Sequence, residues 1–243
     1  MSVIGGRVIW EADLIGDTFD LTELVQATKG KDPSVIKTAN GFGLRYSEFD
    51  SLASYKEVQE SAAGMVKLLS GMCKVLISTR IPLGISGITR YMPDGTRHCF
   101  NTVEERLSVR GTMSMTVTGG DGTVAEIHQA DPVIRWLLLA RRYEPVAKAF
   151  RLFGDPQLGW VTLYKIYELI ESDVGGPKAI TKAGWTSQST ISRFKHSANS
   201  PSVGGDDARH GTETTTPPSK PMDLAEARVM IKMMMHNWLR NKP

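Results

Sequence analysis

The sequence predicts an α+β protein, in which a small mixed α/β N-terminal domain (residues 1–128) is followed by an antiparallel helical bundle (residues 129–243). Three observations favour this fold class. Strand-like stretches separated by hairpin turns fill the first half, one long helical pattern interrupts them, and helical periodicity dominates after residue 131. A chain of 243 residues is also long enough to bury a sizeable core.

Composition bounds the class of protein. Hydrophobic residues make up 41% and charged residues 23%, which is ordinary for a globular chain. The formal net charge of +3 does not by itself identify a nucleic-acid-binding protein. The two cysteines, Cys73 and Cys99, favour a reducing compartment over a disulfide scaffold. No apolar run approaches the roughly 18–20 residues that span a bilayer and no leader pattern is present, so we expect a cytoplasmic protein without a membrane partner.

The first half begins with short elements. We expect two short strand-like stretches at residues 8–10 and 14–15, a brief helix at 19–27 and a strand at 34–37. Asn40-Gly41 predicts a tight hairpin turn before the next strand, because this dipeptide accepts the positive φ angles of such turns.

The clearest helix of the first half covers residues 57–77, where apolar residues recur at spacings of three and four. A second hairpin is predicted for residues 85–91 and 97–102. A third is predicted for residues 112–118 and 123–127, around a glycine-rich turn.

Candidate ligand-binding residues in the first half are scattered. His98, Cys99 and His128 lack further metal ligands at suitable spacing, so we interpret them as surface or core-edge residues. Five arginines could form either a basic patch or a solvated face: Arg80, Arg90, Arg97, Arg106 and Arg110.

A basic helix opens the second half. Asp131-Pro132 predicts its start, and Pro145 is expected to kink or divide it before residue 153. One face carries five cations against a single acid: Arg135, Arg141, Arg142, Lys148 and Arg151. This basic stripe either holds nucleic-acid phosphates or is merely solvated.

Three further helices are predicted. Asp155-Pro156 indicates the start of a helix that Gly175-Gly176 ends, with tyrosines that we interpret as core rather than as a base-stacking platform. Ser187 can cap a shorter helix that stops at Asn199-Ser200-Pro201. Asp223 can cap the closing helix.

A long loop at residues 200–221 separates the last two helices, and loops of this length are often functional. Arginine and histidine beside Gly, Ser and Thr suit phosphate chemistry, since arginine forms paired hydrogen bonds to phosphate and histidine can transfer protons. The candidate catalytic residues surround this loop: Arg193, His196, Asn199, Arg209 and His210.

In helix order and in this Arg/His-bearing loop, residues 131–243 resemble bacterial HEPN-type proteins, especially ApeA-like abortive-infection and stress proteins with an N-terminal mixed domain. The resemblance implies a homodimer that cuts RNA without a metal or other cofactor. In that family a histidine moves a proton and an arginine, four to six residues away, holds the scissile phosphate. Arg209 and His210, supported by Asn199, match the family motif best, and Arg193 with His196 is the second choice. Neither pair has the family spacing.

Two functions stand as hypotheses. The first is an RNA-binding or metal-independent RNA-cleaving effector of a bacterial stress or defence type. The alternative is a non-catalytic HEPN-like module that dimerises or recruits a protein partner. A structural interpretation of the loop is also open. In it Arg193 and Lys195 are solvated, His196 caps helical carbonyls and Arg209 binds Asp206 or Asp207. No phosphate-loop, dinucleotide-binding, nucleophile-elbow or zinc-protease motif is present, which makes a small-molecule enzyme the weakest class.

Overall fold

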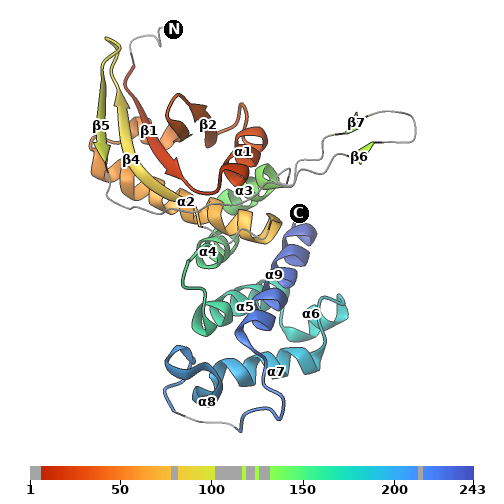
Figure 1. Ribbon diagram of the computed structural model, residues 1–243. Coiled ribbons are helices and arrows are strands. Elements are labelled where there is room, and N and C mark those ends of the chain that lie inside the picture. Colours follow the sequence, from red (N-terminus) through yellow and green to blue (C-terminus); the bar gives the residue numbers. More distant parts are fainter. Residues whose placement is uncertain (1–6, 78–81, 102–116, 119–123, 126–131, 213–215) are drawn as a thin grey trace. The chain divides into compact units, whose positions relative to one another are not determined.

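The computed structural model describes residues 7–77, 82–101, 117–118, 124–125, 132–212 and 216–243 (Figure 1). These residues form a mixed α+β protein, which confirms the predicted fold class at this level. The chain divides into two compact units, Met1–Arg135 and Trp136–Pro243, which we call the sheet unit and the helical unit. None of the described helices is both long and apolar enough to cross a membrane.

The sheet unit contains a five-stranded antiparallel sheet with the order β2-β3-β1-β4-β5. The strands are β1 (Ile9–Ile15), β2 (Ser34–Thr38), β3 (Gly41–Arg45), β4 (Gly84–Tyr91) and β5 (Arg97–Asn101). The first two predicted hairpins are therefore confirmed, one between β2 and β3 and the other between β4 and β5. Gly95 in the second turn has a φ of +86°, a conformation that favours glycine.

The prediction of two separate strand-like stretches near the N-terminus is wrong, because one strand, β1, covers both. Successive side chains of a strand point to opposite faces. Trp10, Ala12 and Leu14 therefore enter the core, where they are at most 5% exposed. Glu11 and Asp13 belong to the other face, so their charges do not interrupt the strand.

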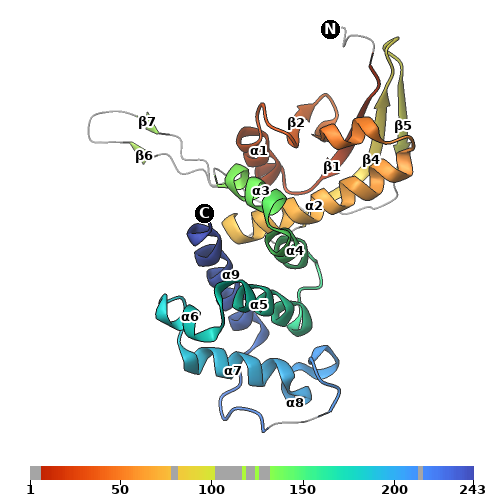
Figure 2. The same cartoon turned by 180° about the vertical axis from the view of Figure 1, so that it is seen from behind.

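One face of the sheet is covered by helix. The sheet unit contains α1 (Thr18–Ala27), the 3-10 turn η1 (Ser47–Ser51) and α2 (Tyr55–Ile77), which confirms the predicted long helix. α2 packs against β1 and β4 (Figure 2). Tyr55 stacks on Phe100 of β5 with 4.7 Å between ring centroids, so α2 covers the face that carries Trp10 and Ile88.

The third predicted hairpin is seen in part. β6 (Val117–Thr118) and β7 (Val124–Ala125) pair antiparallel. The rest of that hairpin lies outside the described residues, as do Arg80, Arg106, Arg110, His128 and Asp131.

The helical unit is organised around α5. Its segments are α3 (Val133–Arg142, which begins at the end of the sheet unit), α4 (Glu144–Phe153), α5 (Trp160–Val174), α6 (Pro177–Lys182), α7 (Gln188–Asn199), α8 (Pro201–Gly204), the 3-10 turn η2 (Gly205–Asp207) and α9 (Leu224–Asn241). α4, α6, α7 and α9 all pack against α5. Tyr167, Phe150, Phe194 and Trp238 fill the core between them and are at most 1% exposed.

Several helix boundaries follow the predictions. Pro145 divides the basic helix, since it lies in the first turn of α4 after Tyr143. Gly175 ends α5 with a φ of +86°. The Ser187 hydroxyl and the Asp223 carboxylate accept backbone hydrogen bonds at the starts of α7 and α9, which confirms both caps.

The predicted start of α5 at Asp155-Pro156 is wrong. Asp155 instead accepts a hydrogen bond from Gln157 N at 2.8 Å, which closes a local turn, and α5 begins at Trp160. Two short helices, α6 and α8, were not predicted. The described part of the helical unit therefore has more helical segments than the four expected.

Candidate nucleic-acid interface and Arg/His loop

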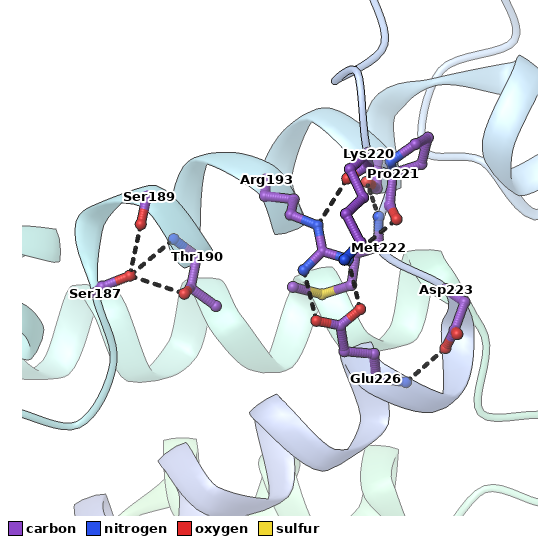
Figure 3. A network of polar contacts seen from close by, with 10 residues as sticks. Ser187, Ser189, Thr190, Arg193, Lys220, Pro221, Met222, Asp223 and Glu226 are labelled. Carbon is purple, nitrogen blue, oxygen red and sulfur yellow. Dashed lines mark hydrogen bonds and ion pairs between the residues drawn. The ribbon is translucent and has the colours of Figure 1, made fainter.

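Arg193 ties the chain before α9 to α7 (Figure 3). Its Nη1 and Nη2 donate to the two carboxylate oxygens of Glu226, each at 2.6 Å. Its Nε donates to the carbonyl of Lys220 at 2.7 Å, and Nη2 also donates to the carbonyl of Pro221 at 3.1 Å. Arg193 is thus not simply solvated, and it could bind a phosphate only after losing part of this network.

Glu226 takes part in a modified capping arrangement. Its backbone N–H donates to Asp223 Oδ1 at 2.7 Å, as in the predicted capping box. In a complete box its side chain would return to the backbone of the cap residue. Here the carboxylate binds Arg193 instead, so the start of α9 is joined to α7.

Arg209 is held against α5. Its Nη2 donates to Glu168 Oε1 at 3.2 Å, and its guanidinium lies 4.3 Å from the ring centroid of Tyr164. Its backbone N–H donates to the carbonyl of Ala198 at 2.8 Å, next to Asn199. The interpretation that Arg209 pairs with Asp206 or Asp207 is therefore wrong.

Asp207 has a separate role at the start of α5. Its Oδ2 accepts a hydrogen bond from Trp160 N at 2.6 Å. The residue at the N-cap position itself is Gly159, which has no side chain to do this. A carboxylate that is distant in sequence thus accepts a hydrogen bond from the first backbone N–H of α5. Its negative charge also interacts favourably with the positive end of the helix dipole.

The two candidate histidines differ in surroundings. His196 is exposed on α7 and His210 is half-buried after η2. Among the described residues, neither imidazole ring makes a hydrogen bond or ion pair, so the His196 side chain does not cap helical carbonyls there. Asn199 Oδ1 is buried and has no hydrogen-bond partner among the described residues.

The site residues therefore form two groups. Asn199 and Arg209 are brought near each other by the Arg209–Ala198 backbone bond, and His210 follows directly. Arg193 contacts the segment before α9 instead.

The tyrosines of α5 are core residues, as predicted. Tyr164 is 7% exposed and stacks on Phe194 with 5.9 Å between centroids. Tyr167 donates a hydrogen bond to Glu171 Oε1 at 2.7 Å, and Lys195 Nζ donates to the same oxygen at 2.9 Å. Burial, that hydrogen bond and the Glu171 charge raise the pKa of Tyr167 far above its usual value of 10.0.

The predicted basic stripe is distributed over two helices. Arg135, Arg141 and Arg142 lie exposed on α3, and Lys148 lies exposed on α4. Arg151 forms an ion pair with Glu144, seven residues earlier. Arg142 also lies over the ring of Tyr143, at 5.2 Å.

A hollow between α4 and α5 adds a cation that the sequence did not identify. The α4–α5 hollow has a volume of about 340 Å³, and its lining includes Lys148, Lys165, Glu168, Ser172 and Asp173. The sequence did not identify Lys165 because it belongs to α5, a different helix from Lys148. Helical periodicity gives the position of Lys165 on α5, but it does not show that Lys148 of α4 lines the same hollow.

The two acidic groups of the α4–α5 hollow are already paired. Glu168 binds Arg209, and Asp173 accepts hydrogen bonds from Lys242 Nζ at 2.8 Å and from Trp238 Nε1 at 2.7 Å. Within the described ranges, Lys148 and Lys165 have no carboxylate partner. The hollow therefore presents two ammonium groups for an anion.

The described first-half candidates do not gather into a metal site. His98 and Cys99 are exposed on β5, and Cys73 is buried in α2, so the two cysteines are free thiols. In the portion of the chain that the structure describes, no three His, Cys, Asp or Glu side chains gather to hold a metal ion.

Comparison with family models, with curated proteins and with solved structures gives no match for this chain. The candidate function therefore depends on the geometry described above.

Proposed function

We propose that the helical unit binds RNA through cations on α3, α4 and α5, as part of an RNA-handling effector of the HEPN-like kind. The observation that carries the proposal is the α4–α5 hollow. Lys148 and Lys165 line it together, while its acidic groups are neutralised by Arg209 and Lys242. Lysine ammonium groups attract a phosphate backbone without reading its sequence, so we expect binding of limited sequence specificity.

The distribution of charge supports the proposal. The helical unit contains 15 Lys and Arg against 10 Asp and Glu, a net charge of +5. The sheet unit contains 14 against 16, a net charge of −2. The modest charge of the whole chain thus conceals a basic unit, and a basic unit attracts polyanions.

Metal-independent cleavage at Arg209 and His210 is the catalytic part of the proposal. Arg209 gives one hydrogen bond to Glu168, so its remaining N–H groups could hold a phosphate and its developing charge. His210 would move the proton of the 2′-hydroxyl or of the leaving oxygen. Asn199 lies beside this pair and could orient the scissile group. Arg193 is the less suitable arginine because Glu226 and two carbonyls already occupy it.

A second candidate function is a non-catalytic HEPN-like module that forms a homodimer or recruits a protein partner. Leu138, Val229 and Met233 favour it, since each exposes more than half of its surface. Val229 and Met233 lie four residues apart on α9 and therefore share one face of that helix. Apolar groups in such a position suit a protein interface.

The experiment measures fluorescence anisotropy of labelled single-stranded and hairpin RNA with purified protein, in EDTA and over a range of salt. Lys148→Gln/Lys165→Gln should weaken binding and lower the slope of log affinity against log salt by about 1 per lysine. The matched control is Lys178→Gln/Lys182→Gln, which removes the same charge from exposed positions on α6. Equal effects of the two double variants would contradict a site at the hollow.

The same RNA samples, analysed on denaturing gels, test cleavage. We expect His210→Ala to abolish it and His196→Ala to leave it unchanged. RNA that binds but stays intact with every form, at concentrations that permit a dimer, would remove the catalytic part and leave RNA binding. Absence of binding would favour the interaction module.

A further inference from the structure

A second hollow lies on the sheet unit, on the face of the sheet opposite α2. Its volume is about 620 Å³, large enough for a small molecule. β1, β4 and β5 and the turn between β2 and β3 all contribute to its lining. The lining is mostly hydrogen-bonding groups, including the side chains of Glu11, Asp13, Thr89, Tyr91, Arg97 and Asn101. We call this the sheet hollow.

Two strand glycines make room for the carboxylates of β1. Asp13 pairs with Gly43 on β3 and with Gly87 on β4, so the residue directly opposite it on each neighbouring strand has no side chain. A Cβ at Gly87 would lie 3.2 Å from Asp13 Oδ2, and one at Gly43 would lie 2.7 Å from the Glu11 carboxylate carbon. Glycine inside a strand weakens it, so its presence on both sides of Asp13 indicates that this space is used.

The two carboxylates of the sheet hollow differ in their partners. Glu11 is only 1% exposed, and it accepts hydrogen bonds from Arg45 Nε at 3.0 Å and from the Tyr91 hydroxyl at 3.3 Å. Its charge is therefore compensated. Burial and the nearby Glu11 charge raise the pKa of Tyr91, which keeps that hydroxyl a neutral donor.

Asp13 has no such compensation. Its Oδ2 accepts one hydrogen bond, from the Thr89 hydroxyl at 2.9 Å, and no described Lys, Arg or His contacts it. A carboxylate that is confined in a hollow and bound only by a neutral hydroxyl attracts a cation. Arg97, on the neighbouring edge strand, has no carboxylate partner among the described residues and can donate to a hydroxyl or carbonyl oxygen.

We propose that the sheet hollow binds a small polyhydroxylated amine, whose ammonium group pairs with Asp13. The ligand's hydroxyl groups match the hydrogen-bonding side chains that make up the rest of the lining, such as Asn101 and Arg97. The sheet unit would then be the ligand-sensing part of the protein. This site is separate from the RNA-binding residues of the helical unit, so either proposal can fail while the other stands.

The test uses the full-length protein and two probes of nearly the same shape. Glucosamine carries the ammonium group, and glucose has a neutral hydroxyl in its place. We expect amide chemical-shift changes in β1, β4 and β5 with glucosamine, at concentrations of about 1–10 mM, and at least roughly tenfold weaker binding of glucose.

Variants decide whether Asp13 is the residue that binds. Asp13→Asn should weaken glucosamine binding by roughly tenfold, because the charge is lost and the shape is kept. Glu60→Gln, the same change at an exposed position on α2, is the matched control and should bind as the wild type does. Gly87→Ala retains the Asp13 charge but intrudes on its space, and it should also weaken binding.

Thermal unfolding of each variant shows whether it is folded at the temperature of the titration. Equal binding of the two probes, an unchanged affinity in Asp13→Asn, or no shift changes with glucosamine at about 10 mM would each overturn the proposal.

Discussion

The two units use their charged side chains in different ways. In the helical unit, ion pairs connect segments that are distant in sequence, such as Arg193 with Glu226 and Arg209 with Glu168. In the sheet unit, the paired Glu11 lies beside Asp13, which meets no cation among the described residues. The comparison teaches that a charged residue in a suggestive motif can be structural, whereas one in an ordinary strand can be left for a ligand.

Hydrogen-bond saturation is the physical basis of this difference. Arg193 makes four hydrogen bonds with its five N–H donors, so little of its binding capacity is left. Asp13 accepts one hydrogen bond at a group with about four acceptor positions. Asp13 is therefore the better candidate for binding a ligand, because more of its hydrogen-bonding positions are left than those of Arg193.

The largest expected effect tests whether Arg193 is structural. Arg193→Ala should lower the free energy of unfolding by about 2 kcal/mol, because it removes four charge-assisted hydrogen bonds whose partners are partly exposed to water. Urea unfolding followed by circular dichroism measures this. A double-mutant cycle with Glu226→Ala should show strong coupling between the two residues.

Arg193→Lys sharpens the same comparison, since lysine keeps the charge but cannot form the paired bonds to Glu226. It should lose part of the stability while RNA cleavage, if present, continues. An Arg193→Lys protein with wild-type stability and no cleavage would instead make Arg193 a catalytic residue.

The second effect concerns Asp207, which caps α5 from a distance. Asp207→Ala should cost about 1.5 kcal/mol of unfolding free energy, within the range for loss of an N-cap. Asp206→Ala is the matched control, because this adjacent carboxylate makes no hydrogen bond or ion pair with described residues. If both variants lose the same stability, a general loss of negative charge, and not the cap, is the cause.

The sequence predicted elements whose signals are local. The hairpin at Asn40-Gly41, the apolar stripe of α2 and the cap at Asp223 depend on neighbouring residues, and all three are confirmed. The two stretches expected at residues 8–10 and 14–15 are one strand, because the alternation from Trp10 to Leu14 continues the strand pattern between them.

The candidate sites could not be predicted in the same way. Asp207 lies 47 residues after the helix start that it caps, and Arg193 lies 33 residues before Glu226. The space around Asp13 depends on the register of β1 with both β3 and β4, which turn chemistry alone does not give. Such partners follow from tertiary packing, so the sequence shows the arginines and histidines near the loop but not the groups that they contact.

The smallest expected effect is a pH dependence at Tyr167. Its pKa is raised by burial, by its hydrogen bond to Glu171 and by the Glu171 charge, so the folded protein holds this proton more tightly than the unfolded chain does. The stabilisation is complete below the unfolded value of 10.0 and is lost as the pH rises above it. Tyr167→Phe should cost about 1 kcal/mol at neutral pH and should flatten the fall in unfolding free energy above about pH 10. Parallel curves for wild type and Tyr167→Phe would contradict a raised pKa of Tyr167 in the folded protein, and with it the close approach of Tyr167 to Glu171.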